Sequence, residues 1–160
     1  MKRSVGSLFL AIVLCLGLAV PALGAGLEFT VENGVLTKYN GPGGSVTIPD
    51  NVTSIGESAF QDCTSLTGVT FPDRVTSIGK NAFRGCTNLT GVNLPTSLTT
   101  IESSAFWGCT ALTSVILPDR VTSINDYAFR NCTSLANVTI PASVTSMGGF
   151  VFRDTPWLQT

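Results

Sequence analysis

One 23-residue unit is repeated five times in register and fills the last three quarters of the chain. The units begin at Val46, Val69, Val92, Val115 and Val138, without an insertion or deletion between them. A fixed period of roughly 20–29 residues is typical of a solenoid, in which each unit packs on its neighbours. The repeated positions then form the core, and the positions that vary between units carry recognition.

Each unit has eight apolar or small positions that recur, which in the second unit are Val69, Phe71, Val75, Ile78, Ala82, Phe83, Cys86 and Leu89. The run over residues 66–71 predicts a short parallel strand. Val69 and Phe71 are expected to point inward and Thr70 outward, because side chains alternate along a strand. The following proline has no N–H to donate and ends the strand. A second extended piece over residues 75–78 and a turn at the Ala-Phe pair complete a mostly β solenoid, with the main strands on its concave face.

The spacing Leu-x-x-Val-x-Phe matches the L-x-x-L-x-L pattern of leucine-rich repeats. More narrowly, the text IPDNVTSIGESAFQDCTSL of the first unit and its four counterparts resembles the BspA-like (Treponema-type) leucine-rich repeats of bacterial surface and secreted proteins. The resemblance covers roughly residues 27–160. It implies a leucine-rich repeat solenoid and, as in some members of that family, adhesion to host or community proteins that include matrix components.

The N-terminal segment has the pattern of a secretory leader. A basic start is followed by an apolar run over residues 8–20 and by small residues at Gly24 and Ala25, which predicts a signal peptide over residues 1–24. A transmembrane anchor is the alternative, but the run is shorter than the roughly 20 residues that a span needs. We expect no membrane span in the mature chain, because no other apolar run is long enough.

Residues 25–45, between the leader and the first unit, are predicted to form an N-terminal cap. Asn33-Gly34 lies between two apolar-flanked runs and is a hairpin signal. Residues 29–44 also look like the lead-in of the BspA-like family. The leucine-rich repeat domain is then expected to cover residues 46–160.

Composition excludes several classes of function. The net charge is −1 and becomes −3 without the two basic residues of the leader, which is too weak to favour a nucleic-acid or anionic-membrane partner. The chain has no histidine, the commonest general base and metal ligand. No serine lies in a nucleophile elbow, and no glycine loop has a phosphate-binding spacing. We therefore expect no enzymatic activity, no cofactor and no metal site.

Four cysteines occupy one column at 23-residue intervals, namely Cys63, Cys86, Cys109 and Cys132. An even number of cysteines in a secreted chain raises the question of disulfides. The column faces inward, and cysteine is among the residues most often buried. Neighbouring rungs are close enough for a bridge, but parallel side chains point the wrong way for its torsion angle. We expect free buried thiols, with one or two bridges as the alternative. Four sulfurs in a line do not suit tetrahedral zinc.

Candidate binding residues lie in two outward columns of the main strands, on the concave side where solenoids usually bind partners. One column contains Thr47, Thr70, Asn93, Ile116 and Thr139, and the other contains Ser45, Gly68, Gly91, Ser114 and Asn137. The surface is small, polar and uncharged, and Ile116 is its exposed apolar member. Either the stacked threonines only stabilise the sheet through cross-strand contacts, or the columns recognise a protein or a glycan.

A second candidate surface lies in the turn after the Ala-Phe pair, where Arg84, Trp107 and Arg130 share a column. Stacking of the units would place Trp107 between the two arginines. A guanidinium is attracted to an aromatic face, and both residue types are enriched at binding hot spots. The alternative is a stack whose members satisfy one another and bind nothing.

The fifth unit departs most from the others, with Phe150, Thr155, Pro156 and Trp157 in place of small or polar residues. A terminal unit covers the open end of a stack, so Phe150 and Trp157 are predicted to cap it. An open parallel edge beyond them would pair with another molecule.

These observations support two hypotheses. The first is a secreted or cell-surface protein that binds an extracellular protein or glycan through the concave columns and Trp107, a role that the family resemblance implies. The second is a structural module that associates with copies of itself through the C-terminal edge and has no foreign ligand.

Overall fold

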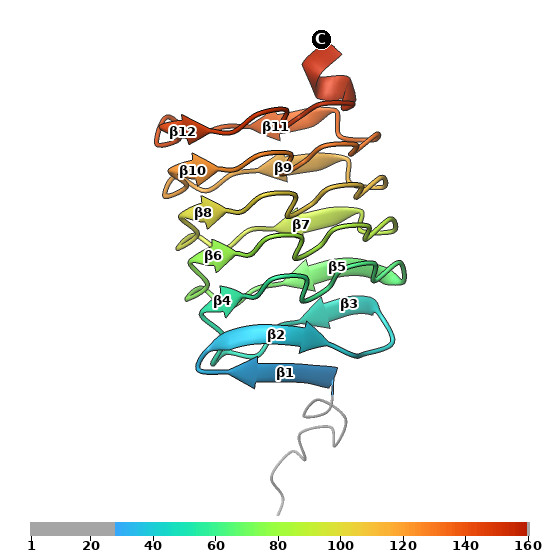
Figure 1. Cartoon of the computed structure of the whole chain (residues 1–160), viewed down its shortest axis with the longest axis vertical. Helices are drawn as coiled ribbons and strands as arrows, with labels where there is room; N and C mark the ends of the chain where they lie inside the picture. The colour runs from blue at the N-terminus through green and yellow to red at the C-terminus, as the bar shows by residue number, and fades with distance from the viewer. Residues whose placement is uncertain (1–27, 160) are drawn as a thin grey trace, which may run out of the picture.

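A computed structural model describes residues 28–159 as a stack of turns along one axis (Figure 1). Each 23-residue unit makes one turn of the coil, and successive turns pair in parallel. The predicted mostly β solenoid is therefore confirmed. The predicted signal peptide over residues 1–24 lies outside the described residues, so that it and the exact domain boundaries stay predictions.

The main strands follow one another up one side of the coil. They are β3 (Gly44–Thr47), β5 (Leu66–Thr70), β7 (Gly91–Asn93), β9 (Ser114–Ile116) and β11 (Asn137–Thr139). Each residue pairs with the one 23 positions later, as Val69 does with Val92. β3, β5 and β7 form one sheet, and β9 and β11 form another. The ladder is therefore interrupted between β7 and β9, although these strands are neighbours in the stack (Figure 1).

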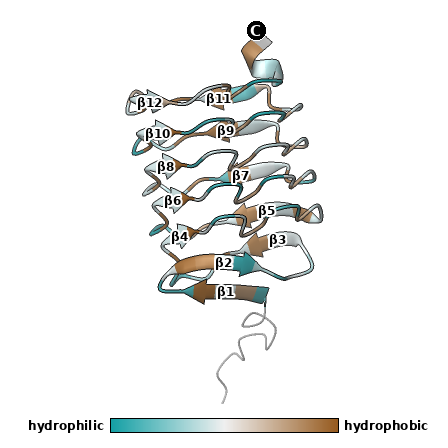
Figure 2. Ribbon diagram, viewed as in Figure 1, coloured by the Kyte–Doolittle hydropathy of each residue, from teal (hydrophilic) through white to brown (hydrophobic). Residues whose placement is uncertain are grey.

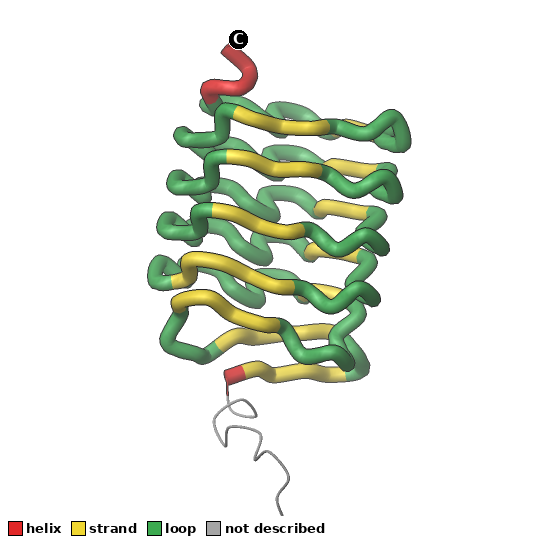
Figure 3. The backbone as a smooth tube through the Cα atoms, turned by 180° about the vertical axis from the view of Figure 1, so that it is seen from behind, coloured by secondary structure: helices red, strands yellow, loops and turns green. Residues whose placement is uncertain are grey.

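The second strand of each turn is only two residues long. These strands are β4 (Ser54–Ile55), β6 (Ser77–Ile78), β8 (Thr100–Ile101), β10 (Ser123–Ile124) and β12 (Ser146–Met147). Together with the N-terminal hairpin they form one continuous sheet in the order β1-β2-β4-β6-β8-β10-β12. Figure 3 shows strands on two sides of the coil, with turns and loops between them.

The predicted hairpin consists of β1 (Phe29–Glu32) and β2 (Val35–Tyr39), which pair antiparallel. Asn33 and Gly34 join them with φ angles of 51° and 81°, as a tight primed turn requires. β2 continues in parallel with β4. The hairpin therefore lies against the first repeat and covers the N-terminal end of the core (Figure 1).

A column of aromatic rings runs through the core. Phe60, Phe83, Phe106 and Phe129 are fully buried, and the centroids of neighbouring rings lie 4.8, 5.2 and 5.1 Å apart. The column continues to Tyr39 in the hairpin and to Phe152 in the last turn. This spacing is close to the ~4.8 Å between paired strands. Ring stacking and backbone pairing therefore favour the same distance between successive turns. Figure 2 shows apolar residues recurring at matching places in successive turns.

The cysteine column lies beside the aromatic column. Cys86, Cys109 and Cys132 are fully buried, and each thiol donates a hydrogen bond of 3.1 Å to the carbonyl of a phenylalanine in the preceding turn, namely Phe60, Phe83 and Phe106. Cys63 lies in the first repeat, so that the turn before it is the hairpin and not another repeat, and it is only half-buried. All four cysteines are free thiols.

Burial keeps these thiols protonated. It raises the pKa of Cys86 and Cys132 to about 12 and raises the pKa of Cys109 well above its ordinary value. At Cys63 burial also raises the pKa, and the nearby carboxylate of Asp62 adds to the effect. Because the thiolate is the reactive form, the buried column is chemically inert at neutral pH and acts as a set of hydrogen-bond donors.

Replacing Phe106 by alanine should lower the free energy of unfolding by about 3–5 kcal/mol, because it removes a fully buried ring and leaves a cavity. Urea unfolding of the purified chain followed by circular dichroism measures this change. The neighbouring Trp107→Ala variant is the control and should lose only about 1 kcal/mol, since it removes a half-buried ring and its arginine contacts. Equal losses in the two variants would show that the central column does not dominate stability.

The free energy of unfolding should fall as the pH rises from about 9 towards about 12, apart from the effect of other groups. The thiol pKa values are higher in the folded than in the unfolded chain, so that the folded state binds more protons over this range and loses stability with rising pH. Urea titrations at several pH values measure the slope. The Cys109→Ala variant should show a shallower slope, and an unchanged slope would argue against a raised pKa at this position.

Candidate binding surface

The outward columns of the main strands form an exposed face. Thr47, Thr70, Asn93, Ile116 and Thr139 are all exposed because they alternate with inward valines such as Val69 and Val115, which are 5 % and 1 % exposed. In the other column Ser45, Gly91, Ser114 and Asn137 are exposed, and Gly68 is half-buried. The structure thus brings the two predicted columns onto one surface.

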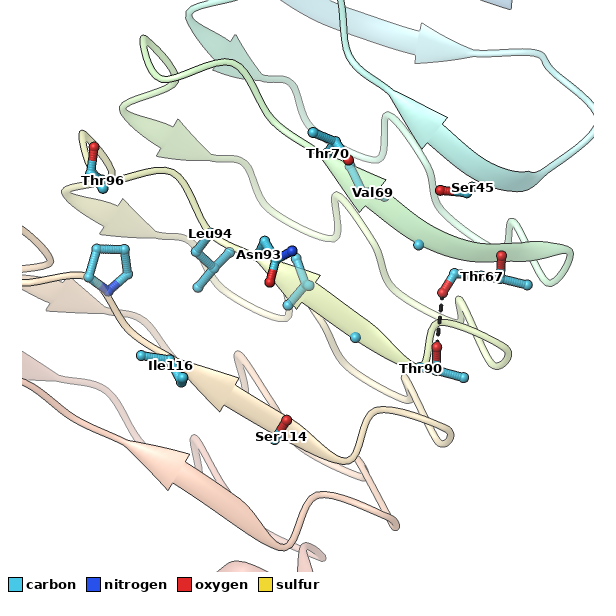
Figure 4. Close-up of a pocket in the computed structure, with 14 residues that line it drawn as sticks. Ser45, Thr67, Val69, Thr70, Thr90, Asn93, Leu94, Thr96, Ser114 and Ile116 are labelled. Atoms are coloured by element: carbon cyan, nitrogen blue, oxygen red, sulfur yellow. Dashed lines mark hydrogen bonds between the residues drawn. The ribbon is translucent and has the colours of Figure 1, made fainter.

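A shallow groove of about 540 Å³ lies in this face over β5, β7 and β9 (Figure 4). Of the ten residues in the two predicted columns, seven line it, namely Ser45, Gly68, Thr70, Gly91, Asn93, Ser114 and Ile116. The others lie on the same face outside its lining, namely Thr47, Thr139 and Asn137. All of the lining residues are uncharged. The face is therefore not uniform: its middle turns are hollowed and its ends are not.

Two glycines leave the space that forms the groove. A Cβ atom on Gly91 would meet nothing within 4 Å, and one on Gly68 would meet only the Ser45 hydroxyl at 3.6 Å. Thr67 and Thr90 also line the groove, and the Thr90 hydroxyl donates a hydrogen bond of 3.2 Å to the Thr67 carbonyl (Figure 4). Substitutions at Gly91 can therefore fill the groove without a steric clash in the fold.

The apolar part of the groove lies where the concave sheet is interrupted. Leu94, Ile116 and Pro118 line it there, and we call these three residues the apolar notch. Ile116 is 71 % exposed. Leu94 is half-buried, whereas its counterparts Ile48, Phe71 and Leu117 are buried. Ile140, the counterpart in the last turn, is half-buried too. Sequence reasoning did not single out Leu94, because its column reads as core. The only signal was that Asn93 and Ile116 replace threonine in the outward column.

The second predicted surface is a stack of arginines and aromatic rings that contributes nothing to the lining of the groove. The guanidinium groups of Arg84 and Arg130 lie 4.7 and 5.3 Å from the centroid of the Trp107 ring. Arg130 also lies 5.6 Å from the centroid of Tyr127 and 3.5 Å from the carboxylate of Asp154. The structure therefore places Trp107 between the two arginines. The members of the stack make many of their interactions with one another.

Tyr127 and Phe150 extend this stack along the outside of the turns. Their rings are stacked with centroids 5.8 Å apart, and Arg153 lies over Phe150 at 5.1 Å. Both residues have positive φ, 60° and 56°, as do their counterparts Ser58, Asn81 and Ser104. This conformation disfavours bulky side chains by roughly 1–2 kcal/mol. The stacking contacts offset part of that strain.

The two predicted capping residues have different environments. Trp157 lies in the short 3₁₀ helix η1 (Pro156–Gln159). Its ring packs edge-on against the buried ring of Phe152, with the two centroids 4.6 Å apart. Phe150 is 57 % exposed and belongs to the outer stack. Met147 and Leu158 are also exposed at this end, and a mostly apolar hollow of about 660 Å³ lies between these side chains. The C-terminal end of the described stack is therefore only partly covered.

Residues 28–159 contain neither a metal site nor a membrane-spanning helix. No group of three or more histidine, cysteine, aspartate or glutamate residues in this range is arranged to hold a metal ion. No helix in the same range is long and apolar enough to cross a membrane.

Comparison with solved structures gives several similar proteins. A leucine-rich repeat protein of T. pallidum is 33 % identical, with a TM-score of 0.77 over 84 % of this chain and 66 % of that one. A leucine-rich repeat protein from Eubacterium ventriosum is 34 % identical, with a TM-score of 0.66 over 74 % of this chain and 32 % of that one. A leucine-rich cell surface protein from Faecalibacterium prausnitzii is 32 % identical, with a TM-score of 0.60 over 79 % of this chain and 44 % of that one.

The chain thus spans 66 % of the first of these proteins and less than half of the other two. No curated protein matches the sequence significantly. The family profile of the BspA type leucine rich repeat region matches residues 39–159 in six copies, which begin before the first of the five complete units at Val46. Leucine-rich repeats of this kind generally form non-enzymatic scaffolds for protein–protein interaction. With its repeats, solenoid fold and family profile in agreement, the chain belongs to the BspA-type leucine-rich repeat family.

Proposed function

We propose that the chain is a secreted or cell-surface module that adheres to an extracellular protein or glycan through its concave face. The observation that carries this proposal is the uncharged groove over β5, β7 and β9. The likeness of the chain to a cell surface protein of Faecalibacterium prausnitzii supports an extracellular location. The predicted signal peptide is consistent with the same location.

The groove suits recognition because its shape is preorganised. Its walls belong to strands that pair with neighbouring turns on either side of the interruption, and the valines beneath them are buried. A partner therefore loses little binding free energy to ordering of the module. The stack around Trp107 offers a second contact surface, because arginine and tryptophan are enriched at binding hot spots.

One specific observation favours a second function, self-association through the C-terminal edge. The apolar hollow there is flanked by exposed Met147, Phe150 and Leu158. The edge strand β12 could also pair with a strand of another molecule. In this alternative the chain is a structural module without a foreign ligand.

The proposed function is tested by measuring binding of the purified chain to immobilised matrix proteins, mucins and a glycan array, with its molecular mass measured in the same buffer. We expect saturable binding by a monomer. The Gly91→Gln variant should bind at least tenfold more weakly, a loss of about 1.4 kcal/mol, because the new side chain fills the groove. Thr122→Gln changes an exposed residue beside β10, outside both columns and the groove, and is the control.

Equal binding by both variants would rule out the groove as the binding surface. A defined oligomer that becomes monomeric in Met147→Asp, together with no binding to any immobilised partner, would favour the self-associating module.

A further inference from the structure

We infer that the groove binds an uncharged, extended polypeptide segment and that the apolar notch of Leu94, Ile116 and Pro118 receives one aliphatic or aromatic side chain of that segment. This inference rests on the proposed function and narrows its partner from a protein or glycan to a protein. Four features of the groove support it: its place in the repeat, its lack of charge, its lack of aromatic rings and its length.

The notch is a unique place on a repetitive surface. A face made only of stacked threonines would present the same contacts to a partner in every turn, so a partner could bind in several registers. The outward column departs from threonine at Asn93 and Ile116, and the sheet is interrupted between the strands that carry them. Leu94 is partly exposed at the same point. An apolar side chain seated there would fix a single register.

The lack of charge excludes charged partners. The lining contains no acidic or basic residue, so a charged group entering the groove would lose water without gaining a counter-charge. At its edge, Asp73-Arg74 and Asp119-Arg120 occupy the turns on either side of Thr96 and are exposed. Each pair is neutral overall. The rim therefore does not attract a polyanion or a polycation, which need a field of one sign.

The lining also favours a polypeptide over a neutral glycan. No aromatic side chain lines the groove, so a sugar ring would find no flat apolar platform. The notch instead offers aliphatic surface with the Asn93 amide beside it, and the Thr70 and Ser114 hydroxyls lie farther along the groove (Figure 4). These groups suit a peptide backbone, which carries one donor and one acceptor per residue.

The dimensions suggest an extended segment. The groove crosses the three turns that carry β5, β7 and β9, a distance of about 10 Å between the outer strands at ~4.8 Å per turn. About three residues of extended chain cover this distance at ~3.3 Å each. The main strands already pair with one another on either side of the interruption. The segment would therefore lie across them and contact side chains, without adding a strand.

The test uses a displayed library of random dodecapeptides as the probe, selected on the full chain and counter-selected on the Gly91→Gln variant. Enriched peptides should contain one aliphatic or aromatic residue among uncharged residues. Synthetic copies should bind the Ile116→Ser variant at least tenfold more weakly than the unmodified chain. The control Thr122→Ser changes an exposed residue beside β10, outside both columns and the groove, and should bind normally. Circular dichroism checks that the variants fold.

Enrichment of charged peptides, or no enrichment over the counter-selecting variant, would overturn the inference. Binding of maltoheptaose or heparin that is lost in Gly91→Gln would overturn it as well. Any partner found in the earlier binding measurements separates the two proposals. Loss of its binding in Gly91→Gln but not in Ile116→Ser would refute the notch and keep the groove, and loss in neither would rule out the groove. The proposed function itself would be refuted if no immobilised partner bound the chain saturably.

Discussion

The stacking of each core column upon itself holds this molecule together. A single 23-residue turn cannot bury its own phenylalanine, but the next turn covers that ring at a distance of about 5 Å, and so on through Phe60, Phe83, Phe106 and Phe129. The backbone pairs at nearly the same spacing. Because both interactions join only neighbouring turns, stability is a sum of similar interfaces, and the outward side chains are free to vary.

Much of the fold could be predicted from the spacing of residues. The alternation of Val69, Thr70 and Phe71 is found in the structure as buried, exposed and buried. Asn33-Gly34 forms the hairpin turn that its residue types indicate. Trp107 lies between Arg84 and Arg130 because residues 23 apart must be neighbours once the period is known. In each case local chemistry or the repeat itself contains the information.

Other features depend on differences between turns that a repeated pattern does not reveal. Leu94 has the residue type of its buried column, yet it is partly exposed where the sheet is interrupted. Cys63 matches the other cysteines in sequence, but the turn before it is a hairpin without the phenylalanine carbonyl that Cys86 uses. Phe150 joins the outer stack. The groove likewise needs the backbone positions of three turns at once, so that its lining could be anticipated only in part.

The uninterrupted register also bears on how such a chain changes length. A gain or loss of one whole unit would leave every column continuous, since each ladder pair joins residues 23 positions apart. A change of one residue would instead place a polar side chain in the core of one turn. The molecule can therefore lengthen or shorten in steps of ~4.8 Å, and a unit added between the hairpin and β5 would move the groove relative to the hairpin without altering β5, β7 and β9.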